Sequence, residues 1–313
     1  MNRKTNKILL AIDASDQSME AVKYVSKMFP PERSNVVIFH SSNHVPEVFW
    51  DLEKCPEFHS KIVFAKAWES GQKKIVNEFT KKARDILFGA GFPKEMLEIK
   101  INDRKTGLAR DILKESRQGY NAVVIGRTGT SKIKDIFLGS IAFKLIDKMG
   151  DIPLIVVGGK PEVKKIIVGF DNSVDANKGV DCLGYMIGDT ECEVELCYVI
   201  RPVHIFYDGY GPAFLPDDEI KWLEINKDKM LPKMENAKKV LNNYDIPLEK
   251  ISTKIIQDSN SRAVALAEEA AGGDWGTIVV GRRGLSAVQD FFLGRVSRKI
   301  VNIASNQAIW LVG

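Results

Sequence analysis

The sequence predicts an α/β protein made of two doubly wound, flavodoxin-like domains, each built on a five-stranded parallel sheet. Three observations support this fold class. The chain contains a long internal repeat, strand-length apolar segments alternate with amphipathic helices in each copy, and a glycine-spaced loop occurs once in each half. Such alternation is typical of parallel sheets that are covered by helices on both faces.

The internal repeat gives the two halves the same organisation. Residues 7–15 return at 165–173, and residues 126–140 return at 281–295 with eight of the fifteen positions identical. A period of about 155 residues is far longer than that of a solenoid repeat, so each copy is expected to be a complete domain.

A short breaker-rich segment, Gly158-Gly159-Lys160-Pro161, lies between the copies. Glycine and proline in such a run favour a linker over a helix or strand. We therefore expect one domain at 1–159 and a second at 163–313.

The elements of the first copy follow in the order that such a domain requires. Ser15 can cap the first helix, and the four-residue spacing of Ile75, Phe79, Ala83 and Leu87 predicts a longer one. The expected strands lie at 7–12, 36–40, 97–101, 122–125 and 154–157, and further helices near 108–117 and 141–148. The second copy repeats this order and ends in strands at 277–280 and 308–312.

The last strand of each copy, at 152–157 and 308–312, is strongly apolar and is expected to lie at a sheet edge. Exposed apolar edges pair readily. We expect these two edges to pair with each other and to form a pseudo-twofold dimer of domains within one chain.

A candidate site follows from this topology, because ligands of doubly wound sheets bind beyond the carboxyl ends of the strands where the winding reverses. With a strand order of 3-2-1-4-5, that crevice lies between strands 1 and 4. Asp13 and Asp171 follow the first strand of each copy, and Gly126 and Gly281 begin the loops after the fourth. The repeated residues thus flank the expected crevice on both sides.

The loop of the first copy has the chemistry of a phosphate site. Gly126 and Gly129 lack a Cβ and let backbone N–H groups approach an anion, while Gly139 and Ser140 open the next helix, whose N-terminus favours a phosphate. The alternative is that the glycines only shape turns and that Ser140 only caps its helix.

The spacing Gly126-x2-Gly129-x9-Gly139-Ser140, with Asp13 after the first strand, resembles the nucleotide-binding signature of the universal stress proteins, and the whole chain is similar to their tandem form. The resemblance is weakest in the insertions near 42–70 and 201–230. It implies a sheet of order 3-2-1-4-5 and bound ATP, with Mg²⁺ or Mn²⁺ on its phosphates. It also implies that Asp13 and the backbone near Ser41 face adenine and ribose, and that Ile141 adjoins the phosphate-binding residues.

The second copy departs from this signature. It keeps Gly281, Gly284 and Gly294, and Val199 stands where the first copy has Ser41, but Arg295 replaces the serine after the last glycine. Arg295 can bind a phosphate through two hydrogen bonds or fill the pocket with its bulk. A hydroxyl could instead come from Ser297. We expect the first site to be the more orthodox one.

Arg127 and Arg282 occupy the same place in both loops. Two interpretations remain open for this pair: contact with a phosphate, or a solvated position at the tip of the loop.

Composition excludes several classes of protein. The 45 basic and 41 acidic residues nearly balance, which argues against a dedicated nucleic-acid-binding protein. No apolar run approaches the roughly 18 residues of a membrane span, and the apolar segment at 8–12 is shorter than the core of a signal peptide, about 7–15 residues. The four cysteines have no metal- or redox-type spacing, so we expect reduced thiols, no metal bound by side chains alone and a cytoplasmic location.

The absence of a repeated catalytic group favours a regulatory protein that binds ATP and changes its partners or its oligomeric state. A homodimer of the chain is one of the states that this hypothesis allows. Two alternatives remain: a slow ATPase or phosphotransferase in which Asp13 holds a metal ion, and an interaction module that has lost its ligand.

Overall fold

The computed structural model describes residues 5–43, 45, 47–128, 138–188, 190–202, 216–257, 259–284 and 293–313. Gly129 lies outside the described residues.

The elements of the first half are β1 (Asn6–Ala11), α1 (Asp16–Met28), β2 (Ser34–Ser42), α2 (Glu47–Trp50), α3 (His59–Gly89), β3 (Leu97–Asp103), α4 (Leu108–Ser116), β4 (Ala122–Gly126), α5 (Ser140–Lys148) and β5 (Leu154–Val157). Those of the second half are β6 (Lys165–Gly169), α6 (Val174–Ile187), β7 (Glu193–Val199), α7 (Pro216–Asn243), β8 (Ile251–Ile256), α8 (Arg262–Gly272), β9 (Thr277–Gly281), α9 (Arg295–Ile303) and β10 (Ala308–Val312).

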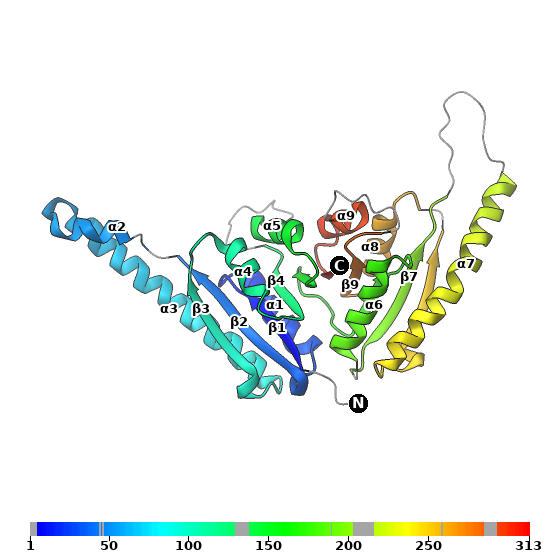
Figure 1. Cartoon of the computed structure of the whole chain (residues 1–313), viewed down its shortest axis with the longest axis horizontal. Helices are drawn as coiled ribbons and strands as arrows, with labels where there is room; N and C mark the ends of the chain where they lie inside the picture. The colour runs from blue at the N-terminus through cyan, green and yellow to red at the C-terminus, as the bar shows by residue number, and fades with distance from the viewer. Residues whose placement is uncertain are drawn as a thin grey trace, which may run out of the picture.

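The strands form one continuous sheet in the order β3-β2-β1-β4-β5-β10-β9-β6-β7-β8 (Figure 1). Each half has the order 3-2-1-4-5 in its own numbering, and all neighbours within a half are parallel. The five strands expected in each half are therefore present, but they belong to one ten-stranded sheet and not to two sheets, because the expected pairing of the last strands joins the halves.

The junction of the halves is the antiparallel pair β5–β10, in which Val157 lies opposite Ala308 and Leu154 opposite Leu311. Both strands are fully buried, and each would otherwise be an exposed apolar edge. Because two copies of one topology meet through the same edge in antiparallel orientation, the halves are related by an approximate twofold axis.

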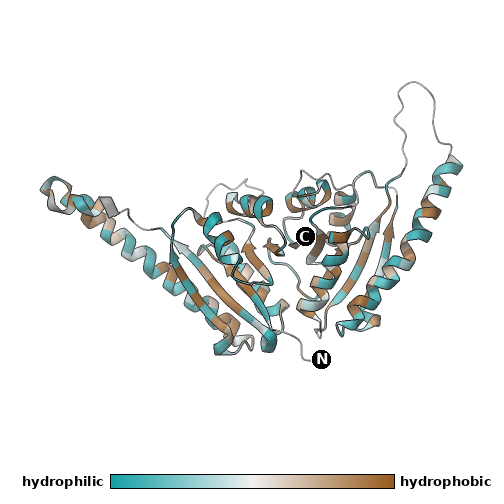
Figure 2. Ribbon diagram, in the orientation of Figure 1, coloured by the Kyte–Doolittle hydropathy of each residue, from teal (hydrophilic) through white to brown (hydrophobic). Residues whose placement is uncertain are grey.

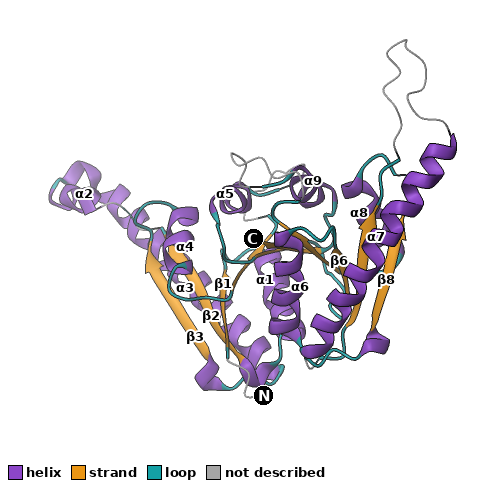
Figure 3. Cartoon of the chain, turned by 45° about the vertical axis from the view of Figure 1, so that its right-hand side comes forward, coloured by secondary structure: helices purple, strands orange, loops and turns teal. Residues whose placement is uncertain are grey.

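Helices cover both faces of the sheet and create two cores that each extend through both halves (Figure 3). Alternate strand residues point to opposite faces: Ile8 and Leu10 belong to the core under α1, α3, α6 and α7, and Leu9 belongs to the core under α4, α5, α8 and α9. Figure 2 shows the apolar strands enclosed between helices whose outward faces are hydrophilic. No helix in the described part of the chain combines the length and the apolar character that a membrane span requires.

The long helices of the insertions are the main difference from the expected elements. The helix expected around 75–87 is α3, which has 31 residues, and its counterpart α7 has 28. Both extend outward beyond the body of the sheet (Figure 1). The regular four-residue apolar spacing at 75–87 marks only the carboxyl-terminal part of α3, so the sequence pattern underestimated the length of this helix.

A buried polar cluster ties the first half to the second. The indole N–H of Trp310 donates to the Tyr24 hydroxyl at 2.8 Å, and this hydroxyl lies 2.9 Å from the hydroxyl of Thr277. Trp310 also stacks on Phe29, with ring centroids 5.7 Å apart. In this way α1 of the first half holds strands β9 and β10 of the second.

A second contact joins the halves at the carboxyl end of α6. The guanidinium of Arg33 donates to the carbonyls of Tyr185 and Gly188 at 2.9 and 2.5 Å, at the end of α6. Cationic donors at the carboxyl end of a helix satisfy its free carbonyls and interact favourably with its dipole.

Replacement of the central hydroxyl, Tyr24→Phe, should lower the free energy of unfolding by about 1–3 kcal/mol, because it strands the buried N–H of Trp310. The loss should affect both halves together, as one unfolding transition in urea followed by tryptophan fluorescence. Tyr185→Phe is the matched control, since its half-buried ring hydroxyl makes no hydrogen bond to any residue that the structure describes, and it should change stability by less than about 0.5 kcal/mol. Equal effects of the two substitutions would contradict the assigned role of Tyr24.

Candidate functional site

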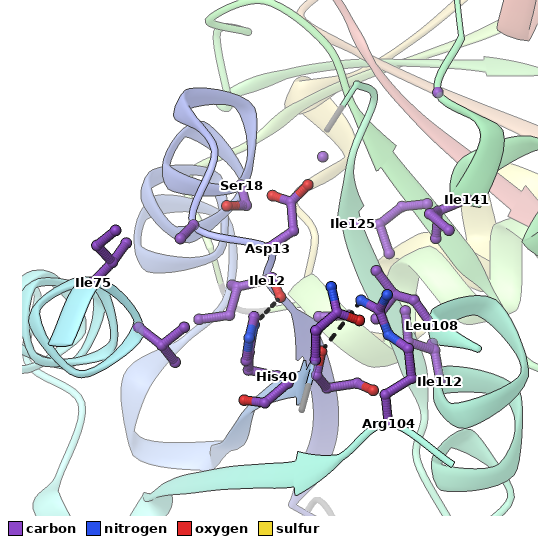
Figure 4. Close-up of a pocket in the computed structure, with 18 of the residues that line it drawn as sticks. Ile12, Asp13, Ser18, His40, Ile75, Arg104, Leu108, Ile112, Ile125 and Ile141 are labelled. Carbon is purple, nitrogen blue, oxygen red and sulfur yellow. Dashed lines mark hydrogen bonds between the residues drawn. The ribbon is translucent and has the colours of Figure 1, made fainter. Parts of the chain in front are cut away.

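The candidate site is a cavity of about 840 Å³ beyond the carboxyl ends of β1 and β4, referred to below as the first cavity (Figure 4). It lies at the place where the winding of the sheet reverses. The sequence-predicted residues that line it are Asp13, Ser41, Gly126, Arg127, Gly139, Ser140 and Ile141. Residues that the sequence analysis missed include His40, Lys73, Ile75, Arg104, Leu108 and Ile112.

The position of Asp13 is set by a tight turn after β1. Its Oδ1 accepts the backbone N–H of Ser15 at 3.1 Å, and Ala14 between them has a positive φ of 61°. Ser15 then caps α1 by accepting the N–H of Ser18. This turn leaves the carboxylate of Asp13 facing the gap between β1 and β4 (Figure 4).

Gly126 has a packing role at the opposite wall. A Cβ on Gly126 would lie only 2.8 Å from the backbone carbonyl carbon of Gln17, in the first turn of α1. Gly281 is constrained in the same way, with the backbone N of Ala176 at 2.8 Å. The first glycine of the loop is therefore required by the contact between strand and helix, whether or not a ligand is bound.

The N-terminus of α5 opens on the first cavity. Gly139 is the N-cap residue, and no side-chain cap of this helix is found within the described residues. The N–H of Gly139 itself donates to the carbonyl of Arg127 at 2.9 Å, which fixes the start of the helix to the loop after β4. With Ser140 exposed beside it, this end of α5 presents unpaired N–H groups and the positive end of the helix dipole.

The side chain of Arg127 points away from the first cavity. It is buried, and its guanidinium donates to the carbonyls of Asn302 and Ala304 in the second half at 3.0 and 3.3 Å. Arg282 is buried in the same way and donates to the carbonyl of Ile146 in the first half. Neither interpretation from the sequence, phosphate contact or solvated loop tip, describes these guanidinium groups.

The wall expected to face adenine and ribose is held by hydrogen bonds. The hydroxyl of Ser41 donates to Oδ2 of Asp111 at 2.9 Å, and Arg104 donates to the carbonyl of Ser41 at 3.5 Å. Burial raises the pKa of Asp111, but hydrogen bonds from Ser41 and Thr106 outweigh it, so the net shift is downward. Asp111 therefore stays ionised and keeps Ser41 in place.

His40 lies between Ser41 and the end of β1, and its Nδ1 donates to the carbonyl of Ile12 at 2.9 Å. Burial is the main cause that lowers the pKa of this imidazole, and the hydrogen bond to Ile12 only partly offsets it. His40 lies near the carboxyl end of β2, and Arg104 follows the last residue of β3, so the rule of carboxyl ends could have found them. Lys73 and Ile75 come from α3, whose position over the cavity no sequence signal indicated.

A smaller cavity of about 410 Å³ occupies the equivalent place in the second half, the second cavity. The predicted residues that line it are Asp171, Val199, Gly281, Gly284, Gly294, Arg295 and Ser297. Gly284 lies so close to Asp171 that a Cβ would be 2.8 Å from its carboxylate. The hydroxyl of Ser297 donates to the carbonyl of Gly281 at 2.6 Å, so its proton is already engaged by the backbone.

Comparison with known proteins shows which proteins this geometry resembles. Residues 162–307 match the model of the universal stress protein family. A universal stress protein from Archaeoglobus fulgidus DSM 4304 is 18% identical, covers 98% of both chains and has a TM-score of 0.61. A putative universal stress protein from Pseudomonas aeruginosa UCBPP-PA14 is 10% identical over 98% of this chain and 93% of that chain, with a TM-score of 0.55. No curated protein matches the sequence.

These matches confirm the resemblance to a tandem universal stress protein that the motifs indicated. The second half matches the family model directly, and the solved structures share the fold of the whole chain.

The lowered pKa of His40 predicts a specific dependence of stability on pH. A histidine whose pKa is lower in the folded state binds its proton preferentially when unfolded, so stability decreases as the pH falls below about 6.5, the value of the unfolded chain. The loss is at most about 1.4 kcal/mol per pH unit. His40→Gln should therefore show a smaller drop in the free energy of unfolding between pH 7.5 and pH 5.5 than the parent protein.

The matched control for this measurement is His59→Gln, at an exposed position on α3. Urea midpoints at the two pH values should respond to pH in this control as they do in the parent. If His40→Gln retained the full pH-dependent loss, other groups would be responsible for it.

Proposed function

We propose that the first half binds ATP in the first cavity and that the protein is a nucleotide-dependent regulator of a stress response. One observation carries the proposal: the uncapped start of α5, at Gly139 and Ser140, borders the same cavity as Asp13. A volume of about 840 Å³ lies within the range of small-molecule and cofactor sites, about 300–1,000 Å³.

The two sides of the first cavity suit the two parts of a nucleotide. Apolar side chains of Ile12, Leu108 and Ile112 line one side, near Ser41 and its carbonyl, and offer a surface for adenine (Figure 4). The other side consists of backbone and of the start of α5, where an anion gains hydrogen bonds from N–H groups and attraction to the helix dipole. Lys73 of α3 adds a cation at the rim.

A divalent ion on the phosphates would fit Asp13. Its Oδ1 accepts the N–H of Ser15, whereas no hydrogen bond to Oδ2 is found among the described residues. Mg²⁺ usually takes one or two carboxylates together with water and phosphate oxygens. Asp13 would then hold the ion, and the ion would neutralise phosphate charge.

Regulation would act through Arg127. Its carbonyl accepts the N–H of Gly139 at the start of α5, while its guanidinium binds carbonyls of Asn302 and Ala304 in the other half. A phosphate that shifts Gly139 would therefore displace a residue of the junction between the halves. We infer that occupancy of the first cavity changes the surface around α5 and α9, and so the choice of partners.

Two further properties belong to the proposal. The four cysteines are free thiols, which is typical of a reducing compartment, and we place the protein in the cytoplasm. We also propose that chains associate as homodimers in a way that depends on the nucleotide.

ATP should bind to the full chain with one high-affinity site in the first half, measured by calorimetry, and nucleotide should be released on denaturation of the purified protein. Ser140→Glu should weaken this binding roughly tenfold or more, because a carboxylate takes the place of the phosphate at the helix N-terminus. The variant should fold normally, since acidic residues are favourable in the first turn of a helix.

Gln118→Glu is the matched control, because it introduces the same charge at an exposed position beyond the far end of α4. Its ATP affinity should equal that of the parent. A parent protein that releases no nucleotide and binds no ATP in calorimetry would refute the proposed function.

An enzymatic alternative is tested through the same carboxylate. If the protein is a slow ATPase in which Asp13 holds the metal ion, Asp13→Ala should abolish phosphate release, and Asp16→Ala, at an exposed position outside the cavity, should leave it unchanged. Hydrolysis by Asp13→Ala at the parental rate would exclude this role of Asp13.

A further inference from the structure

The two cavities differ sharply in charge. Four arginines line the second cavity, and Asp171 is the single acidic residue among the described residues of its wall. The equivalent positions of the first half, matched by their place in each element or loop, are neutral. Arg262, Arg283, Arg295 and Arg298 stand where the first half has Leu108, Thr128, Ser140 and Phe143.

Two of these arginines are held by carboxylates. Nε of Arg283 and its backbone N–H both donate to Asp175, at 3.2 and 3.0 Å, and Asp175 is buried. Arg298 reaches Asp147 of the first half at 3.5 Å. Because Arg283 pairs with Asp175 through Nε, its terminal N–H groups are oriented but take no part in this ion pair.

The other two arginines have no acidic partner within the described part of the chain. Nε of Arg262 is buried there and makes no hydrogen bond. Arg262 also lines the second cavity, where no carboxylate among the described residues is paired with it. Arg295 is the first residue of α9, and its guanidinium extends from a helix N-terminus for which the described part of the chain supplies no side-chain cap.

The geometry points to a site for a compact polyphosphorylated anion in the second cavity. Guanidinium groups bind phosphate oxygens in pairs, and the open start of α9 adds backbone donors. The second cavity has about half the volume of the first, 410 against 840 Å³, while it carries more positive charge. This combination favours a chain of two or three phosphates over a complete nucleotide.

The inference does not require ATP in the first cavity. Its two possible sources, a free polyphosphate chain and the phosphate tail of a nucleotide, share the same chemistry and are separated by the experiment.

The experiment uses the full chain with Ser140→Glu as background, so that anions are repelled from the first cavity. Calorimetry with inorganic tripolyphosphate should show one site per chain. Adding Arg295→Ser, which restores the serine of the first half, should weaken binding roughly tenfold or more, and Arg262→Ser should do so as well. Arg283 is not a suitable target, because its side chain also pairs with the buried carboxylate of Asp175 and its removal would disturb that contact.

Arg117→Ser is the matched control, since it removes one exposed positive charge beyond the end of α4. Its affinity for tripolyphosphate should stay within twofold of the background. Absence of binding in the background, or equal losses in Arg295→Ser and Arg117→Ser, would overturn the inference, the latter by showing unspecific attraction of an anion to a basic surface. Thermal unfolding of each variant checks that it is folded.

ATP is titrated into the same variants. Tighter binding of tripolyphosphate than of ATP supports a free phosphate chain, and the reverse order supports a nucleotide tail. Failure of ATP to bind the unmodified protein, together with retained binding of tripolyphosphate by the Ser140→Glu chain, would refute the proposed function of the first cavity and leave this inference intact.

Discussion

The antiparallel pairing of β5 with β10 is the constraint on which the rest of the molecule depends. Each strand is an apolar edge that one half alone would expose to water. Pairing turns two sheets into one of ten strands and lets both hydrophobic cores continue across the junction. Tyr24, Trp310 and Thr277 then form polar contacts that exist only because the edges are joined.

The same junction connects the loops of the two candidate sites through hydrogen bonds that cross from one half to the other. Arg127 and Arg282 each combine a backbone position in a binding loop with a guanidinium that enters the opposite half. Burial lowers the pKa of both groups, and Nη1 of Arg282 makes no hydrogen bond among the described residues. Reciprocal arginines of this kind give a physical route by which one loop can affect the other.

The sequence predicted the elements that repeat and the edge of the sheet where the first cavity lies, because apolar strands and glycine spacing are local signals. It did not predict the long α3, since the outward part of this helix buries only Ile62 and Ala65 and leaves Phe64 and Trp68 exposed, which gives a weak amphipathic pattern. It also misjudged Arg127: an arginine in a loop looks solvated until the opposite half is present to offer carbonyl groups. His40 lies beside the predicted Ser41, so the rule that ligands bind at the carboxyl ends of the strands could also have identified it.

The glycine-spaced loop itself carries two kinds of information that the structure separates. Gly126 and Gly281 are both required by close contact with the first turn of a helix, so they are retained in a domain that folds this way even where the ligand differs. The residue after the last glycine has no such packing duty: Ser140 and Arg295 are both exposed at the start of their helices. The glycines therefore indicate the fold, whereas the residue at the helix N-terminus is the better guide to the kind of ligand. A serine there suits a nucleotide phosphate held by backbone amides, whereas an arginine among three others suits an anion of higher charge density.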